Sequence, residues 1–147
     1  MSFALVPVRR QDLEALARIH AESFPVEAWD HIALAQILAM PGADGRIAMT
    51  ARAEKLGFLL SILVAGEAEI VTLCVSPSAR RRGVARALLA DLFARTPASV
   101  VLEVAADNGA GLALYRAAGF QIAGKRRGYY RRPGAPPVDA WLLRRMI

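Results

Sequence analysis

Residues 70–93 read IVTLCVSPSARRRGVARALLADLF and predict a strand, a basic loop and a helix in succession. The apolar run 70–75 is typical of a strand that is buried on both faces. Pro77 ends that strand, because proline cannot donate a hydrogen bond to a neighbouring strand. Apolar residues then recur at helical spacing, which predicts a helix with one apolar stripe; they are Val84, Ala85, Leu88, Leu89 and Leu92.

The loop between this strand and helix has the chemistry of a phosphate-binding site. Three consecutive arginines precede Gly83 and the start of the helix. A helix N-terminus offers unpaired N–H groups and a partial positive charge to an anion, and glycine lets a ligand approach the backbone. The loop lacks the Gly-Lys-Ser/Thr of a P-loop and the three spaced glycines of a dinucleotide-binding turn. We therefore expect it to hold a phosphorylated ligand of another kind.

Length and composition indicate one globular domain over residues 1–147, with enough apolar residues for a core. The apolar run 56–66 is well short of the ~20 residues that cross a bilayer, so no membrane association is expected. The first residues are apolar and precede Arg9 and Arg10, the reverse of a signal peptide. A single cysteine excludes an internal disulfide framework. We expect a cytoplasmic protein.

The net charge of +6 has two explanations. It is typical of a nucleic-acid-binding protein, or it reflects an arginine-rich composition together with a site for a polyanionic cofactor. The basic residues cluster at 80–86, 125–132 and 144–145. We favour the second explanation and expect no direct nucleic-acid recognition.

The other elements complete a mixed α/β fold of the α+β type. The expected strands are 4–8, 46–53, 56–64, 70–75, 100–104, 120–123 and 138–143, and the expected helices are 13–24, 27–40, 84–93 and 108–119. Asp12 and Asn108 are expected to cap helices, and Asp44-Gly45 to form a turn. Strands 70–75 and 100–104 should be parallel, because a long helical connection joins them. The sequence thus predicts a sheet of about six to seven strands with about four helices.

Glu103 is the first candidate for acid–base chemistry. It interrupts the otherwise apolar strand VVLEV at 100–104. A carboxylate that is desolvated there would have a raised pKa, which suits a general base. A structural glutamate paired with a nearby arginine, or one at an exposed strand end, fits the sequence equally well.

Tyr115 is the second candidate. It lies seven residues after Asn108, so both fall near one face of a short helix. Its phenol either donates a proton in a reaction or packs in the core, which is the commoner use of such a residue. Cys74 lies in an apolar strand and is expected to be an inert buried thiol. His20 and His31 lack neighbouring ligands, so no metal site is expected.

The loop and its flanks resemble a known family. The segment Arg80-Arg81-Arg82-Gly83-Val84-Ala85 is similar to the acyl-CoA-binding signature Gln/Arg-x-x-Gly-x-Gly/Ala of the GNAT acetyltransferases. The segments LEVAADN (102–108), ALYR (113–116) and Gly119-Phe120 resemble the RimI branch of that family. Enzymes of this branch acetylate protein N-termini, and the bacterial member modifies the N-terminal alanine of ribosomal protein S18. The resemblance covers nearly the whole chain and implies the GNAT fold.

The resemblance also implies the parts of an active site. Acetyl-CoA is the expected co-substrate, with no metal, and the expected acceptor is a protein N-terminus, possibly of a ribosomal protein. Glu103 would accept the proton of the amine, and Tyr115 would protonate the leaving thiolate. The implied cofactor-binding residues are Leu73, Cys74, Val75, Arg80, Arg81, Arg82, Gly83, Val84, Ala85, Arg86 and Asn108, and those at the acceptor are Phe24, Tyr129 and Tyr130.

Two other functions stay open at this point. The same fold serves acetyltransferases whose acceptor is a small amine, such as a polyamine, an aminoglycoside or an amino acid. A CoA-binding regulatory module without activity is the third possibility. The presence of both Glu103 and Tyr115 disfavours it, because a module that only binds CoA needs neither proton-transfer group.

Overall fold

One sheet runs through the chain in the strand order β1-β2-β3-β4-β5-β7-β6. The computed structural model describes residues 2–147. The strands are β1 (Ala4–Pro7), β2 (Ala43–Met49), β3 (Lys55–Val64), β4 (Glu67–Val75), β5 (Ser99–Ala105), β6 (Gln121–Tyr130) and β7 (Val138–Met146). All neighbours are antiparallel except β4 and β5, which are parallel. The predicted mixed sheet with one parallel crossover is confirmed.

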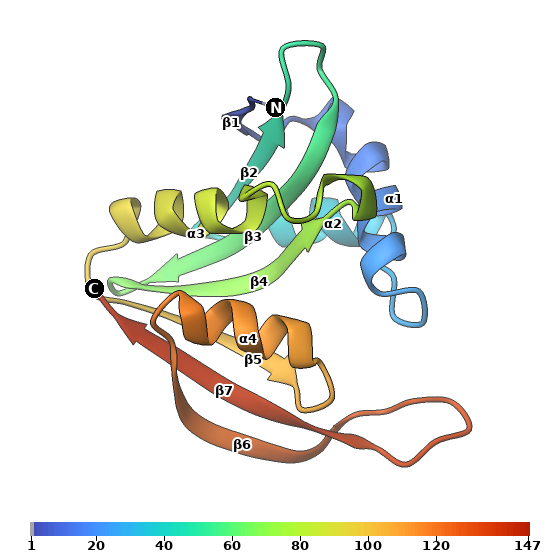
Figure 1. The fold of residues 1–147 in the computed structure, drawn as a ribbon, viewed down its shortest axis with the longest axis vertical. Coiled ribbons are helices and arrows are strands. Elements are labelled where there is room, and N and C mark those ends of the chain that lie inside the picture. Colours follow the sequence, from blue (N-terminus) through green and yellow to red (C-terminus); the bar gives the residue numbers. More distant parts are fainter. Residues whose placement is uncertain (1) are drawn as a thin grey trace.

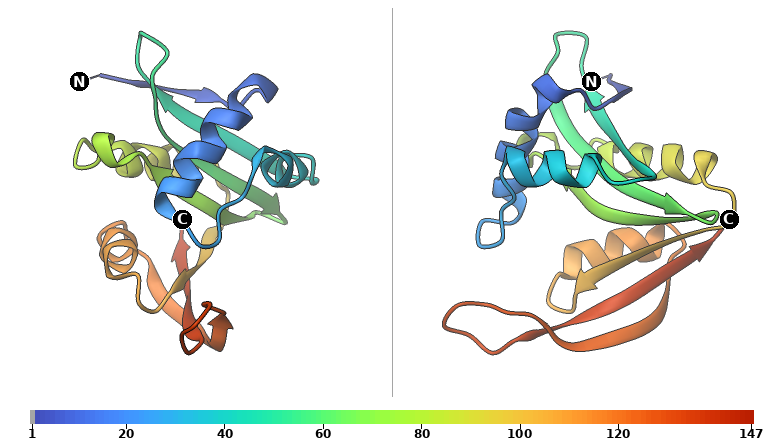
Figure 2. Two further views of the ribbon diagram at one scale, coloured as in Figure 1. Left: turned by 90° about the vertical axis from the view of Figure 1, so that its right-hand side faces the viewer. Right: turned by 180° about the vertical axis from the view of Figure 1, so that it is seen from behind.

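Helices cover both faces of this sheet (Figures 1 and 2). They are α1 (Leu13–Ser23), α2 (His31–Leu38), α3 (Val84–Arg95) and α4 (Gly109–Ala117), with short 3-10 turns η1 (Arg10–Asp12) and η2 (Pro77–Ala79). On one face α1 and α2 pack around Leu16, Leu34 and Phe58. On the other, α3 and α4 pack around Leu88, Leu92 and Leu102. None of the helices within residues 2–147 is long and apolar enough to cross a membrane.

The N-terminal helices begin differently from the prediction. Asp12 lies at the start of α1, but its side chain accepts the N–H of Arg9 at 2.8 Å and makes no cap to the helix itself. The second helix is α2, which is shorter than the predicted 27–40. Asp30 caps it by accepting the N–H of Ala33 at 2.9 Å. The residues before Asp30 therefore form a loop between α1 and α2.

Asp44-Gly45 lies inside β2, so the predicted turn is wrong. Gly45 is required by close packing, because a Cβ there would lie 2.7 Å from Val8 Cγ2 and 2.9 Å from Leu60 Cδ2. The predicted antiparallel hairpin of β2 and β3 is confirmed. Its turn spans residues 50–54, where Ala53 has a φ of 64°.

The last hairpin is much longer than predicted. The expected strand 120–123 is β6, which extends to Tyr130, so Tyr129 and Tyr130 belong to a strand and not to the connecting loop. β6 forms one edge of the sheet, and most of its side chains are exposed. An exposed edge strand needs no apolar alternation, which is why the pattern did not reveal it.

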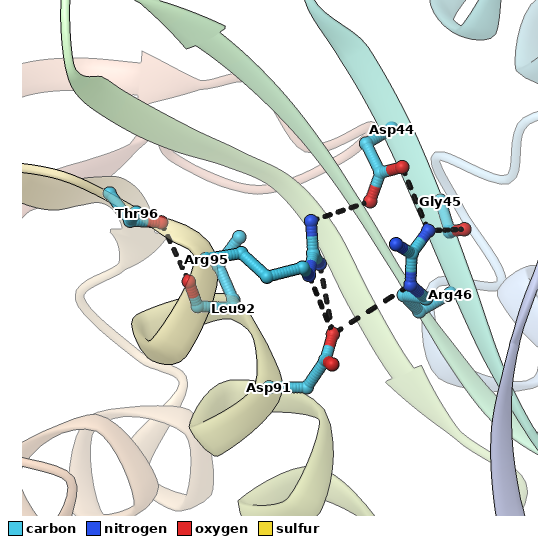
Figure 3. A network of polar contacts seen from close by, with 7 residues as sticks. All are labelled: Asp44, Gly45, Arg46, Asp91, Leu92, Arg95 and Thr96. Atoms are coloured by element: carbon cyan, nitrogen blue, oxygen red, sulfur yellow. Dashed lines mark hydrogen bonds and ion pairs between the residues drawn. The ribbon is translucent and has the colours of Figure 1, made fainter.

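An ion-pair network joins β2 to α3 on the face that α3 covers (Figure 3). Arg95 binds Asp44 through Nη1 at 3.0 Å and Asp91 through Nη2 at 2.9 Å. Arg46 binds the other oxygen of Asp44 at 2.8 Å. Asp44 Oδ2 is inaccessible to solvent, and its contact with Arg95 lacks hydrogen-bond alignment. The network thus holds the end of α3 against the sheet.

Replacement of Arg95 should destabilise the protein, because Asp44 Oδ2 would lose its cation. We expect Arg95→Met to lower the free energy of unfolding by about 1–3 kcal/mol in urea denaturation. Arg52→Met, in the exposed 50–54 turn, is the control and should change it by less than about 0.5 kcal/mol. Equal losses in the two variants would contradict a stabilising role for the network.

Candidate active site

The two parallel strands at the centre of the sheet separate soon after they meet. β4 and β5 pair only from Glu67↔Ser99 to Glu69↔Val101. β4 continues to Val75 and β5 to Ala105 without further pairing to each other in residues 2–147. Beyond Glu69, the edge of β4 that faces β5 therefore has backbone N–H and C=O groups free for a ligand.

An irregularity in β4 lies where the strands diverge. Opposite β3, Leu60 pairs with Thr72 and Ser61 with Ile70, which leaves Val71 as an extra residue. A bulge of this kind bends a strand and re-aims its side chains. Four successive residues, 70–73, consequently line one pocket.

The pocket has a volume of about 560 Å³ and fills the gap between the separated strands. Its walls come from the α1–α2 loop, β4, β5, α4 and the far end of the β6–β7 hairpin. Of the predicted site residues, the structure brings together Phe24, Leu73, Glu103, Asn108, Tyr115 and Tyr130 as pocket-lining residues. The sequence thus identified side chains from five separate segments that line one cavity.

The predicted phosphate loop follows the end of β4. Gly83 has a φ of 78° and lies at the N-terminus of α3, and Arg81 has a φ of 65°. A Cβ at Gly83 would meet no atom of residues 2–147 within 4 Å, so glycine is needed here for its left-handed backbone conformation and not for close packing. Left-handed residues beside a helix N-terminus turn several N–H groups to one side, which is the geometry of an anion site.

The residues of this loop fit a polyanionic ligand. Arg80, Arg81, Arg82 and Arg86 are exposed, whereas Val84 is buried against the core. The loop lies outside the pocket lining but continues directly from β4, whose unpaired edge faces the pocket. A long ligand with a phosphorylated end fits this arrangement.

Glu103 lies on β5 with its side chain 23% exposed, and it forms an ion pair with Arg126 Nε at 3.1 Å. The carboxylate is therefore neither fully desolvated nor unpaired, and it has the arginine partner that its sequence position also allows. Arg126 comes from the edge strand β6, across β7 from β5. Nothing in the sequence pattern indicates which arginine pairs with Glu103.

Two phenols line the same pocket as this carboxylate. Burial raises the pKa of Tyr115 far above its usual value, and Phe120 contacts its ring edge-on at 5.5 Å between centroids. Burial, and secondarily the charge of Glu103, raises the pKa of Tyr130 to about 12. Both phenols keep their protons at neutral pH. Tyr115 thus packs in the core and also lines the pocket.

Three predicted residues have different settings. Tyr129 is 48% exposed, lies outside the pocket lining and packs under Arg126. Cys74 is buried, and burial raises the pKa of its thiol, as expected of an inert cysteine. Asn108 caps α4 as predicted, by accepting the N–H of Gly111 at 2.9 Å. Its amide NH₂ keeps its donors for a ligand.

His20 is a pocket residue that sequence reasoning missed. Its ring stacks on Trp29 with 4.7 Å between centroids, and Nδ1 accepts the N–H of Trp29 at 3.1 Å. Burial lowers the pKa of His20, so the ring is neutral and its proton is on Nε2. In the sequence, the only indication of this role is that a histidine occurs within the apolar stripe of a predicted helix. The contact fixes the α1–α2 loop as one wall of the pocket.

Within residues 2–147, no cluster of three or more His, Cys, Asp or Glu side chains has the arrangement of a metal site.

His20 should make stability depend on pH, because its pKa is lower in the folded than in the unfolded chain. Its contribution is complete above the unfolded pKa of about 6.5 and declines as pH falls below it, with a slope of at most about 1.4 kcal/mol per pH unit. We expect His20→Asn to flatten the decline of the unfolding free energy between pH 7 and 5. The exposed His31→Asn should keep the wild-type slope, and a slope unchanged by His20→Asn would contradict the assignment.

The sequence of the chain matches the model of the Acetyltransferase (GNAT) family over residues 13–120. N-alpha-acetyltransferase RimI of Mycobacterium tuberculosis is 49% identical over 80 residues, which are 54% of this chain and 49% of that protein. The ribosomal protein bS18-alanine N-acetyltransferase of Escherichia coli K12 is 37% identical over 86 residues, 56% of this chain and 58% of that protein. The chain thus spans about half the length of these curated relatives in the matched regions.

Three further proteins are similar to the chain, one in sequence and two in structure. Mycothiol acetyltransferase of Clavibacter michiganensis is 41% identical over 101 residues, which are 66% of this chain and 30% of that protein. The crystal structure of the ribosomal-protein-S18-alanine N-acetyltransferase from Escherichia coli has a TM-score of 0.88 at 27% identity and covers 99% of this chain and 94% of that one. Ard1 from Thermoplasma volcanium, at 22% identity and a TM-score of 0.87, shares the fold.

Proposed function

The chain belongs to the acetyltransferase (GNAT) family, and we propose that it transfers an acetyl group from acetyl-CoA to the N-terminal α-amine of a protein. The separation of β4 from β5 is the observation that carries this proposal. It leaves an unpaired backbone edge beside a pocket that contains Glu103 and Tyr115. An acyl donor on that edge and an amine in the pocket would meet between a proton acceptor and a proton donor.

Acetyl-CoA fits the free edge and the loop. The groups of Leu73 and Val75 that face the free edge of β4 would bind the pantetheine arm, with Cys74 between them bonded to β3, and the N–H groups around Gly83 with the neighbouring arginines would bind the pyrophosphate. The Asn108 NH₂ group would donate to the cofactor, since its carbonyl already caps α4. When bound, acetyl-CoA supplies the thioester that the amine attacks. The N–H of Val75 on this edge would polarise the thioester carbonyl.

Glu103 is proposed to remove the proton of the amine, directly or through a water. An α-ammonium has a pKa of about 7.7–8.0 and is mostly charged at neutral pH, so it needs a proton acceptor before it can attack. For this role the carboxylate must give up its contact with Arg126. That contact is 3.1 Å long, and the side chain of Arg126 is 59% exposed. Exposed ion pairs of this kind are weak and readily exchanged. Tyr115 is proposed to protonate the departing thiolate.

The RimI relatives favour a protein N-terminus as the acceptor, and the protein we propose is ribosomal protein S18 or one with a similar N-terminus. Phe24 on the α1–α2 loop and Tyr130 at the end of β6 both line the pocket, where they would contact the first residue of the acceptor. A small-molecule amine is the second candidate, because the chain also resembles a mycothiol acetyltransferase.

A panel of acceptors separates these candidates. We expect mass spectrometry to detect acetylation of alanine- or serine-initiated peptides at the α-amine in the presence of acetyl-CoA. Acetylation of small amines alone would replace the peptide proposal with the second candidate. Binding of CoA by calorimetry without transfer to any amine would refute both.

Removal of the proposed base should matter most where the amine is charged. Glu103→Gln should lower kcat/KM roughly 10²-fold at pH 7 and much less at pH 9, where the amine is already deprotonated. Glu69→Gln removes an exposed carboxylate of β4 outside the pocket and should follow the wild-type pH profile. The same loss at both pH values would reject Glu103 as the base.

Removal of the proposed acid should slow turnover without weakening acetyl-CoA binding. Tyr115→Phe keeps the packing against Phe120 and deletes only the hydroxyl, so we expect kcat to fall roughly 10²-fold and KM for acetyl-CoA to stay within about twofold. Tyr129→Phe deletes an exposed phenol outside the pocket and is the matched control. Similar kcat values for the two variants would assign Tyr115 to packing alone.

A further inference from the structure

The pocket is acidic although the chain as a whole is basic. The net charge is +6, yet the charged residues that line the pocket are Glu27, Glu103, Asp107 and a single arginine, Arg132. His20 adds no charge, since burial lowers its pKa. Complementarity between a pocket and its ligand favours cationic acceptors over neutral or acidic ones.

Arg132 spans the pocket between two of these carboxylates. Its Nε lies 3.4 Å from Glu27 Oε1, and its Nη1 lies 3.3 Å from Asp107 Oδ2. Glu27 belongs to the α1–α2 loop, Asp107 to the β5–α4 loop and Arg132 to the β6–β7 hairpin. One guanidinium thus joins three walls of the pocket, and we call the three residues the arginine clasp.

The clasp is separate from the proposed proton-transfer group. Glu103 has its own partner, Arg126, and takes no part in the clasp. The side chains of Arg132, Glu27 and Asp107 are 30%, 38% and 54% exposed. Ion pairs this accessible contribute little to stability and exchange partners easily.

We propose, resting on the function proposed above, that Glu27 and Asp107 form a specificity site for a lysine or arginine side chain close to the acceptor N-terminus, which replaces Arg132 in the clasp. A cationic acceptor exchanges one cation for another, so both carboxylates remain paired. A neutral acceptor that displaces Arg132 leaves them without a cation, and an acidic one adds repulsion. Arg132 is thus the internal competitor of the acceptor side chain.

Paired peptides test this exchange. Each pair begins with alanine and carries arginine or citrulline, its uncharged near-isostere, at position two, three or four. At one of these positions we expect the wild-type enzyme to show a KM about three- to tenfold lower for arginine than for citrulline. The double variant Glu27→Gln/Asp107→Asn should bring that ratio below about twofold, because it loses the interaction with the charge.

A matched variant controls for the overall charge of the enzyme. Glu14→Gln/Glu54→Gln removes two exposed carboxylates outside the pocket and should retain the wild-type ratio. Arg132→Gln should lower KM further for the arginine peptides, because it removes the competitor. A clasp that only braces the walls would change the KM values of both peptides of a pair together.

The outcomes separate this inference from the function on which it rests. Peptide acetylation with equal KM values for arginine and citrulline at all three positions, or a ratio that the double variant leaves intact, overturns the specificity site alone. Acetylation of small amines without any peptide overturns both proposals. Turnover of the citrulline peptides by each variant shows that it is folded.

Discussion

The short parallel contact between β4 and β5 is the constraint on which the rest of this structure depends. The two strands are parallel because a crossover through α3 joins them, and they pair only at their N-terminal ends. The extra residue Val71 then bends β4 away from its partner. The two strands therefore leave a space between them. α4 closes one side of this space with Tyr115, which packs against Phe120. What remains is a pocket with polar backbone on one side and a carboxylate on the other.

Charge is distributed so that the two ends of the site differ in sign. The exposed arginines at 80–82 and 86 lie in the loop after β4 and in the first turn of α3. The acidic side chains gather instead around the pocket, between the α1–α2 loop and β5. An anionic donor and a cationic acceptor would therefore be attracted to different ends of one site. The net charge alone cannot express this, because it sums two regions with opposite roles.

The sequence predicted what local pattern controls and missed what tertiary contacts control. The strand, loop and helix of residues 70–93 follow from apolar periodicity and glycine, and the structure has them close to the predicted bounds. Local composition predicts a turn at Asp44-Gly45, because it cannot reveal that Val8 and Leu60 crowd Gly45 or that Arg95 binds Asp44. For the same reason the sequence does not determine the surroundings of Glu103. Its partner, Arg126, is close in space only through the order β5-β7-β6.

A bulge at Gly128 interrupts the edge strand β6 just before the residues that line the pocket. Between Arg126↔Ala140 and Tyr130↔Val138, three residues of β6 face the single residue Asp139. Gly128 takes a φ of 58° in this bulge and donates its N–H to Asp139 Oδ1 at 2.8 Å, and that hydrogen bond, with Lys125, lowers the pKa of Asp139. Successive residues of a strand face opposite sides, so Tyr130 enters the pocket while Tyr129 remains outside. The bulge therefore lies between Arg126, which pairs with Glu103 before it, and Tyr130 and Arg132, which line the pocket after it.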